Sequence, residues 1–407
     1  MGGEASRPCQ LRLRRGIRSR LMYRSGQRGT DVIIRRQVLF GGAALVAGGA
    51  AVAQHGGHGA APALPEAGSA PAPFTLLQGG APHHLTGEQE AQRVLDSPAT
   101  AGAPGRWVAR AVMPIPRSEM AWSTVWAGRM HVVGGYGEGR VDRPYHHVYD
   151  PTGDRWLNAA PLPRGANHVA VVADGGRIYA LGGFTEQNRN ADANAYAYDV
   201  TSDRWTRIAP LPRARGAGAA VALNGRIHLI GGASNPTPER ASVGWHEAYD
   251  PVSDTWSVLK PLPGARDHVG SVAHDNRIHI IGGRFNTFEY NTPLHHVYLP
   301  DRDTWEERAP MPTSRSGHGL VLYRDRYFAM GGEAGIVDRG RITQAKVYGQ
   351  MESYDPKTDT WQSHAPMPTP RHAVAAVLIG DWIYVAGGGA VTGGAIQSAI
   401  HEAFTLT

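Results

Sequence analysis

The chain has 407 residues, a formal net charge of +6 and one cysteine, Cys9. Ten arginines and only two carboxylates fall within residues 1–53, so that segment carries a net charge of +8 and the remainder carries −2. The basic character therefore belongs to the N-terminal segment, which argues against nucleic acid as a partner of the remaining residues. A single cysteine also excludes an internal disulfide and a thiol nucleophile after that segment.

Residues 1–53 predict a twin-arginine-type signal peptide. Arg35 and Arg36 precede an apolar run rich in Ala and Gly, and Ala51-Val52-Ala53 offers a small-x-small cleavage site. The apolar run of about 16 residues is short for a membrane span. We therefore expect a protein exported from a bacterial cell, periplasmic or secreted, with no transmembrane anchor after cleavage.

Residues 54–104 predict a mostly disordered linker. The segment is rich in Ala, Pro and Gly, a composition that cannot form a packed core. It contains four histidines without a thiol partner or a fixed geometry, so we predict no metal site there: His55, His58, His83 and His84. No metal and no cofactor are predicted for the chain as a whole.

Residues 105–407 repeat one unit with a period of about 50 residues. In each unit a short apolar strand runs into a pair of glycines. The pairs are Gly134-Gly135, Gly182-Gly183, Gly231-Gly232, Gly282-Gly283, Gly331-Gly332 and Gly387-Gly388. Period-2 alternation of apolar residues predicts four short antiparallel strands per unit, here called a to d.

The end of each unit predicts how the units pack. An Asp-x-Trp segment precedes Pro-Leu-Pro or Pro-Met-Pro, and the tryptophans can fill the wedge between stacked sheets. One four-stranded sheet cannot bury both of its faces, so the units must stack. The last unit lacks a tryptophan strand, and residues 105–111, which contain Trp107, can supply it. We predict an all-β, six-bladed propeller with four antiparallel strands per blade, closed by this N-terminal strand.

Gly-Gly, Tyr-Asp-Pro, Asp-x-Trp and Pro-Leu-Pro-Arg recur in this order, and this arrangement resembles the kelch-repeat β-propeller superfamily over residues 105–407. The resemblance extends distantly to six-bladed sialic acid mutarotases and to the galactose oxidase propeller. The copper-radical site of the latter needs a cysteine crosslinked to a tyrosine. With Cys9 in the leader, the resemblance does not imply that cofactor here.

The d–a and b–c loops of an antiparallel blade emerge at the same end, so their side chains should meet on one face. Arginines and histidines recur there and would make a positive, hydrogen-bond-rich rim for carboxylates or sugars. The candidate binding residues are Arg117, Arg164, His168, Arg213, Arg266, His268, Arg284, Arg315, His318, Arg371 and His372. The structural alternative is that they bond to loop carbonyls of neighbouring blades, once per repeat.

Glu333 follows a Gly-Gly pair directly and is the one carboxylate that the repeat places beside the axis. If the protein is an enzyme, Glu333 is the candidate acid/base. An ion pair between blades is an equally good interpretation of this residue.

Three functions are compatible with these features. The first is an exported kelch module that binds a protein or glycan ligand on the loop face. The second is a metal-independent sugar mutarotase or epimerase that uses Glu333, as the resemblance to the sialic acid enzymes implies. The third, an oxidoreductase with a cofactor, has no supporting metal constellation and is the weakest.

Overall fold

A computed structural model describes residues 103–120, 122–235, 240–286, 290–338, 341–394 and 396–407. The predicted signal peptide (1–53) and nearly all of the predicted linker (54–104) lie outside the described residues. The described residues contain no helix that is long and apolar enough to cross a membrane.

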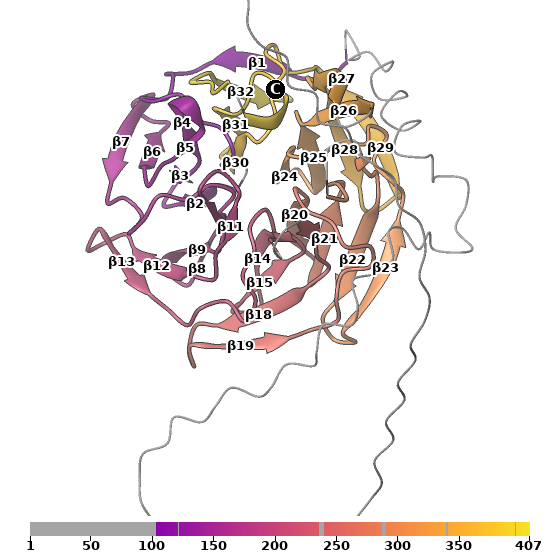
Figure 1. Cartoon of the computed structure of the whole chain (residues 1–407). Helices are drawn as coiled ribbons and strands as arrows, with labels where there is room; N and C mark the ends of the chain where they lie inside the picture. The colour runs from indigo at the N-terminus through magenta and orange to yellow at the C-terminus, as the bar shows by residue number, and fades with distance from the viewer. Residues whose placement is uncertain (1–102, 121, 236–239, 287–289, 339–340, 395) are drawn as a thin grey trace, which may run out of the picture. The chain divides into compact units, whose positions relative to one another are not determined.

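Six four-stranded antiparallel sheets are arranged in a ring, as Figure 1 shows. Blade one contains β2 (Thr124–Trp126), β3 (Arg129–Val133), β6 (His146–Asp150) and β7 (Arg155–Ala159). Blade two contains β8 (Ala170–Asp174), β9 (Arg177–Leu181), β12 (Ala195–Asp199) and β13 (Arg204–Arg207). Blade three contains β14 (Ala219–Leu223), β15 (Arg226–Ile230), β18 (His246–Asp250) and β19 (Thr255–Val258).

The remaining blades follow the same order. Blade four contains β20 (Gly270–His274), β21 (Arg277–Ile281), β22 (His295–Leu299) and β23 (Thr304–Arg308). Blade five contains β24 (Gly319–Tyr323), β25 (Arg326–Met330), β28 (Met351–Asp355) and β29 (Thr360–His364). Blade six contains β30 (Ala375–Ile379), β31 (Trp382–Ala386), β32 (His401–Thr405) and β1 (Arg106–Ala109). The prediction of an all-β, six-bladed propeller is confirmed.

The outermost strand of blade six comes from the N-terminal side of the propeller. β1 pairs antiparallel with β32, with Trp107 opposite Phe404, and the two rings lie 5.3 Å apart. The indole Nε1–H of Trp107 donates to the carbonyl of Ala365 in blade five at 2.8 Å.

The tryptophans of the outer strands join each blade to its neighbour by the same hydrogen bond. Each donates its indole N–H, at 2.8 to 3.0 Å, to a carbonyl in the segment that follows the outer strand of the preceding blade. The pairs are Trp156 with Ala111, Trp205 with Ala160, Trp256 with Ala209, Trp305 with Lys260, Trp361 with Ala309 and Trp107 with Ala365. The tryptophans therefore fill the wedges between blades and also satisfy backbone carbonyls there.

The glycine pairs are required by the close approach of neighbouring blades. At Gly231 (φ +65°), a Cβ would lie 2.6 Å from the carbonyl oxygen of Arg266 in the next blade. The amide of Gly232 (φ +106°) donates to that same oxygen at 3.0 Å. Only glycine adopts this backbone and leaves room for the neighbouring chain. The second glycine of each pair makes the equivalent bond around the whole ring.

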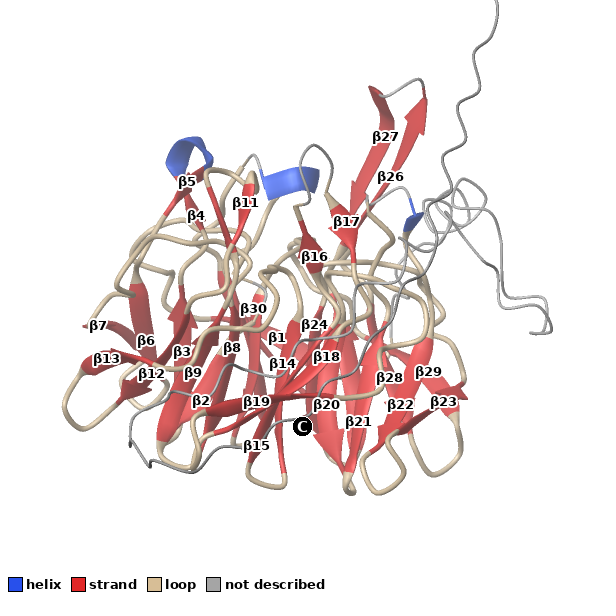
Figure 2. Ribbon diagram, turned by 60° about the horizontal axis from the view of Figure 1, so that its bottom comes forward, coloured by secondary structure: helices blue, strands red, loops and turns tan. Residues whose placement is uncertain are grey.

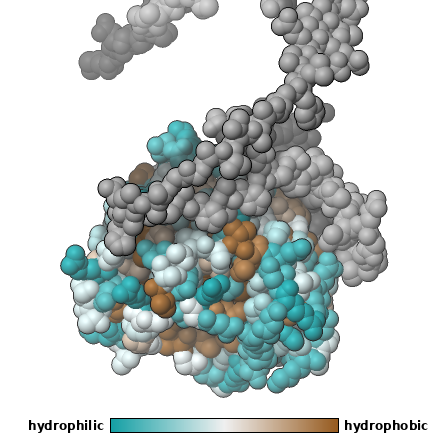
Figure 3. Space-filling model, turned by 90° about the horizontal axis from the view of Figure 1, so that it is seen from below, coloured by the Kyte–Doolittle hydropathy of each residue, from teal (hydrophilic) through white to brown (hydrophobic). Residues whose placement is uncertain are grey.

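Four b–c connections form two-stranded hairpins that project from one face, as Figure 2 shows. They are β4 (Tyr136–Gly137) with β5 (Val141–Asp142), β10 (Phe184–Thr185) with β11 (Asn190–Ala191), β16 (Ala233–Ser234) with β17 (Ala241–Ser242), and β26 (Glu333–Asp338) with β27 (Arg341–Val347). Two short 3-10 turns, η1 (Glu138–Arg140) and η3 (Thr392–Gly394), lie in the b–c connections of blades one and six. From below, the described surface mixes hydrophilic residues with smaller hydrophobic patches (Figure 3).

Candidate functional site

A three-residue segment precedes each inner strand, and we call it the axial triplet. The third residue of each triplet has a left-handed backbone, with φ between 48° and 61°. These residues are Glu119, His168, Ala217, His268, Gly317 and Ala373. From blade two to blade six, the amide of this residue donates to the carbonyl of its counterpart in the preceding blade, at 2.6 to 3.1 Å. The bonds hold the third positions side by side around the axis.

The second residue of each triplet pairs with the residue that follows a Gly-Gly pair. The bridges are Ser118 with Tyr136, Asn167 with Phe184, Gly216 with Ala233, Asp267 with Arg284, Ser316 with Glu333 and His372 with Gly389. This pairing brings Arg284 and Glu333 to the same level of the ring as the third residues. The fold therefore gathers three kinds of residue at the axial end of the blades: the second and third residues of each triplet, and the residue after each Gly-Gly pair.

Seven charged or ionisable residues meet there, and we call them the axial cluster: Glu119, His168, Asp267, His268, Arg284, Glu333 and His372. All seven are buried. They come from five different blades, and most of the contacts that join them cross blade boundaries. The cluster is therefore a product of the closed ring.

Glu119 is the carboxylate on which three histidines converge. Its Oε2 lies 2.8 Å from Nε2 of His168 and 4.0 Å from Nε2 of His268. Its Oε1 lies 3.2 Å from Nε2 of His372. Burial alone would raise the pKa of Glu119, but His168 and His372 hold that pKa well below its usual range. Glu119 is therefore an ionised carboxylate at neutral pH.

His372 lies between two carboxylates. Its Nε2 is 3.3 Å from Oε2 of Glu333 as well as 3.2 Å from Oε1 of Glu119. Burial works against the charged ring, but Glu333 and Glu119 outweigh it and raise the pKa of His372 to about 9. The ring is therefore an imidazolium at neutral pH, able to pass a proton to either carboxylate.

Arg284 connects three other members of the cluster. Its Nη1 donates to Oε1 of Glu333 at 2.7 Å, its Nε to Oδ1 of Asp267 at 3.2 Å, and its Nη2 to Nε2 of His268 at 3.0 Å. Burial and the guanidinium lower the pKa of His268 well below its usual range, so this ring stays neutral. Asp267 and Glu333 raise the pKa of Arg284 despite its burial.

The loop between β31 and β32 covers the cluster. The amide of Gly393 donates to Oε2 of Glu333 at 2.8 Å, and the hydroxyl of Ser118 donates to the carbonyl of Gly394 at 3.4 Å. A Cβ on Gly394 would fall against the carboxylate of Glu119. Both oxygens of Glu333 are thus engaged, and its side chain is only 1% exposed.

Four rim arginines are fully buried and bond to blade ends. Arg117 donates to the carbonyls of Gly134 and Tyr145, and Arg266 donates to those of Gly282 and Pro263. Arg315 pairs with Glu352, and Arg371 pairs with Glu402. Both arginines also donate to backbone carbonyls of their own blades. These contacts hold each arginine within its own blade, whereas the structural alternative placed its partners in neighbouring blades.

The other two rim arginines lie two residues before the first residue of a triplet, the position that Arg117 holds in blade one. Arg164 pairs with Asp192, and Arg213 pairs with Glu247 at 2.6 Å; each side chain is about one quarter exposed. The residue equivalent to Arg117 is Arg215 in blade three, and sequence reasoning did not select it. Arg215 is fully buried and also binds Glu247.

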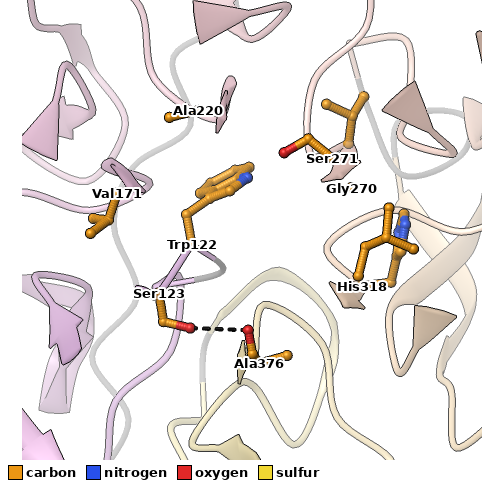
Figure 4. A pocket seen from close by; sticks show the side chains of 10 residues that line it. Trp122, Ser123, Val171, Ala220, Gly270, Ser271, His318 and Ala376 are labelled. Carbon is orange, nitrogen blue, oxygen red and sulfur yellow. Dashed lines mark hydrogen bonds between the residues drawn. The ribbon is translucent and has the colours of Figure 1, made fainter. Parts of the chain in front are cut away.

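His318 does not join the axial cluster. It lines a cavity of about 80 Å³ among the inner strands, together with Trp122, Ser123, Ser271 and Leu320 (Figure 4). Burial and Arg315 lower the pKa of His318 to about 3, so this ring is neutral. Figure 4 shows the indole of Trp122 pointing into the space between the blades.

Sequence reasoning placed four residues of the axial cluster on the rim and Glu333 beside the axis. The structure brings all five together: His168, His268, Arg284, Glu333 and His372. Sequence reasoning missed Glu119 and Asp267, which complete the cluster. A strict alignment of the triplets would have found Glu119, because it occupies the third position that His168 and His268 hold in other blades.

Comparison with known proteins gives two family models. The model of the KLHDC2/KLHL20/DRC7 Kelch-repeats domain matches residues 209–389, and the Kelch motif matches residues 166–212. Kelch-like protein terF of Aspergillus terreus is 30% identical over 319 residues, which cover 73% of this chain and 68% of that protein.

Two further comparisons are more limited. Human Kelch-like protein 35 is 43% identical over 182 residues, or 44% of this chain and 27% of that protein. The solved structure of YjhT covers 72% of this chain and 95% of its own, with a TM-score of 0.60 and 13% sequence identity. The similarity to YjhT concerns the fold alone.

Proposed function

This chain belongs to the kelch-repeat β-propeller family, and we propose that it is an exported binding module that holds a protein ligand on the face of its b–c loops. One observation carries the proposal. The b–c hairpins differ from blade to blade and project into solvent, whereas the ionisable chemistry beneath them is buried. Loops that the repeat does not require are the usual carriers of function on such a scaffold.

The surface of these loops suits a protein partner. Val141 is 44% exposed in the hairpin of blade one, and Val391 and Ile396 are 40% and 55% exposed in the b–c loop of blade six. Blades one and six are neighbours in the ring, so these apolar side chains belong to adjacent loops. The exposed carboxylate Glu138 belongs to the same b–c connection as Val141. Exposed apolar side chains next to charged ones are typical of protein interaction surfaces.

A glycan is the alternative ligand for the same face. An acidic sugar would need free guanidinium groups, and all six predicted rim arginines (117, 164, 213, 266, 315 and 371) bond to groups within the propeller. This distribution favours a protein over an acidic glycan. Export by the twin-arginine route is part of the proposal and rests on residues 1–53, which lie outside the described residues.

A second candidate function is a metal-independent sugar mutarotase-like enzyme. The imidazolium of His372, shared between Glu119 and Glu333, favours it, because this arrangement can relay a proton to Glu333. Catalysis would require the loop that carries Gly393 to leave Glu333 accessible. Anomer exchange of neutral and acidic sugars, followed by NMR, tests this function. Acceleration by the wild type that is lost in Glu333→Gln would establish it.

Site-specific photocrosslinking tests the binding proposal. A photoreactive amino acid replaces Ile396 on the loop face, and in a matched variant it replaces Val252, a 95% exposed residue in the turn between β18 and β19. We expect the first variant to crosslink one envelope protein and the second to crosslink none of it. Equal crosslinking at both positions would contradict the proposal. If the protein retains a purified oligosaccharide and forms no protein adduct, the ligand of the loop face is a glycan.

A further inference from the structure

We propose that Glu119, His168 and His268 bind one divalent first-row transition metal ion at the axis of the propeller. One ligand atom from each residue lies within 4.8 Å of the other two. Two imidazoles and a carboxylate are a ligand set that zinc and its neighbours in the first transition row prefer. The sequence predicted no metal site, because the three residues are far apart in the chain.

Both histidines are held in the tautomer that a metal needs. Nδ1 of His168 bonds to Oδ1 of Asn167, and Nδ1 of His268 bonds to Oδ1 of Asp267. Because each oxygen accepts a proton from Nδ1, Nε2 is the ring nitrogen left to face the metal position. The guanidinium of Arg284 donates to Nε2 of His268, which is consistent with that assignment. Metal-binding histidines usually have such a partner behind the ring.

The space between the ligands lacks a well-placed donor. Oε2 of Glu119 and Nε2 of His168 are buried and 2.8 Å apart, yet neither has a hydrogen-bond partner of normal geometry among the described residues. Without a proton on Nε2, two acceptor atoms this close would repel each other unless another cation lay between them. A metal ion would satisfy both atoms. A proton on Nε2 of His168 is the competing occupant, and the experiment distinguishes the two.

The fold itself does not require these side chains. The same third position of the triplet holds Ala217, Gly317 and Ala373 in the other three blades, with the same backbone conformation and the same hydrogen bonds between blades. Alanine or glycine at the third position is therefore enough to form the hydrogen bonds that join the blades. Glu119 and the two histidines add ligand atoms to a rigid frame, which is the condition for a preorganised site.

Metal binding would displace one contact. Nη2 of Arg284 occupies the lone pair of His268 at 3.0 Å, and the ion would replace that hydrogen bond. Arg284 retains Glu333 at 2.7 Å and Asp267 at 3.2 Å, so the guanidinium remains paired.

Cobalt titration of the purified full chain tests this inference. His55, His58, His83 and His84 are replaced by Asn in every variant, so that the N-terminal segment contributes no imidazole. We expect one Co²⁺ per chain, with visible d–d absorption, displaced by one Zn²⁺. Glu119→Gln and His268→Gln should each weaken binding at least tenfold. Asp267→Asn, behind His268, should weaken it about 10-fold to 100-fold.

His318→Gln is the matched control, because His318 is equally buried but lies outside the three ligands. Its affinity for Co²⁺ should equal that of the wild type. If Glu119→Gln does not fold, X-ray absorption of the zinc-loaded wild type carries the test and should report two imidazoles. No stoichiometric binding, a shell of water alone, or binding unaffected by all three variants would overturn the inference and leave the proton as the occupant.

Discussion

Arg284 and Glu333, 49 residues apart in the sequence, form a buried ion pair between adjacent blades at 2.7 Å. The guanidinium and the carboxylate begin the b–c connections of blades four and five, and both side chains are at most 7% exposed. Removing either partner would leave the other charge buried. The pair therefore couples the chemistry of the loop face to the integrity of the ring.

Glu333→Ala should lower the free energy of unfolding by about 3 kcal/mol, because it removes a buried carboxylate that binds both Arg284 and His372. Urea unfolding followed by tryptophan fluorescence measures this loss. Glu138→Ala, which removes an exposed carboxylate of η1, should change the free energy by less than about 0.5 kcal/mol. Equal effects of the two substitutions would mean that the pair with Arg284 contributes nothing to stability.

The second glycine of each pair should be irreplaceable. A Cβ on Gly232 (φ +106°) would lie 2.7 Å from the carbonyl oxygen of Gly216, so Gly232→Ala should cost at least about 2 kcal/mol. Gly225→Ala is the matched control, because Gly225 has φ +71° but no atom within 4 Å of its Cβ position. It should cost only about 1 kcal/mol. Thermal unfolding of both variants distinguishes steric clash from backbone strain.

Ring closure by the N-terminal strand should be visible as a stability effect of Trp107. Trp107→Ala removes the hydrogen bond to Ala365 and the contact with Phe404, and should cost about 3 kcal/mol. Val112→Ala, at a residue 64% exposed a few positions later, should be nearly neutral. A stable Trp107→Ala variant would show that β1 is dispensable to blade six.

Buried histidine pairs should make the protein sensitive to acid. His228 bonds to His246 at 2.8 Å, and His131 with His146 and His279 with His295 form equivalent pairs in blades one and four. Burial lowers the pKa of His228 to about 4 and that of His246 to about 3, against about 6.5 in the unfolded chain. The unfolded state therefore binds more protons between these values. The stability that these neutral histidines contribute should be complete above pH 6.5 and should fall as the pH drops toward 4.

Thermal unfolding between pH 7.5 and 4.5 measures this loss. The double variant His228→Phe, His246→Met copies the residues of blade five, Phe328 and Met351, at the same strand positions. We expect a flatter dependence of Tm on pH for this variant. An unchanged slope would assign the acid sensitivity to other groups.

Much of the scaffold could be predicted from the sequence because it depends on contacts that recur. The Gly-Gly pairs, the tryptophans and the alternating strands each follow from one rule applied six times. The sequence did not show which arginine of each repeat is buried. Pro-Leu-Pro precedes both Arg213 and Arg215, and only the structure shows that Arg215 takes the buried position.

The axial cluster could be predicted only in part. Glu119 precedes the first complete repeat, where the sequence pattern is weakest. Its contacts with His168, His268 and His372 join three other blades, so they depend on closure of the ring. No local pattern encodes such distances, and burial of the cluster is equally invisible in the sequence.

The central claim is tested most directly by measuring how tightly the crosslinked partner binds two variants, each with one exposed residue replaced. Ile396→Asp places a charge on the loop face, and Val252→Asp places the same charge on the turn between β18 and β19. With purified partner, we predict that Ile396→Asp weakens binding at least tenfold, while Val252→Asp binds like the wild type. Undiminished binding by Ile396→Asp, or an equal loss in both variants, would contradict recognition through the b–c loop face.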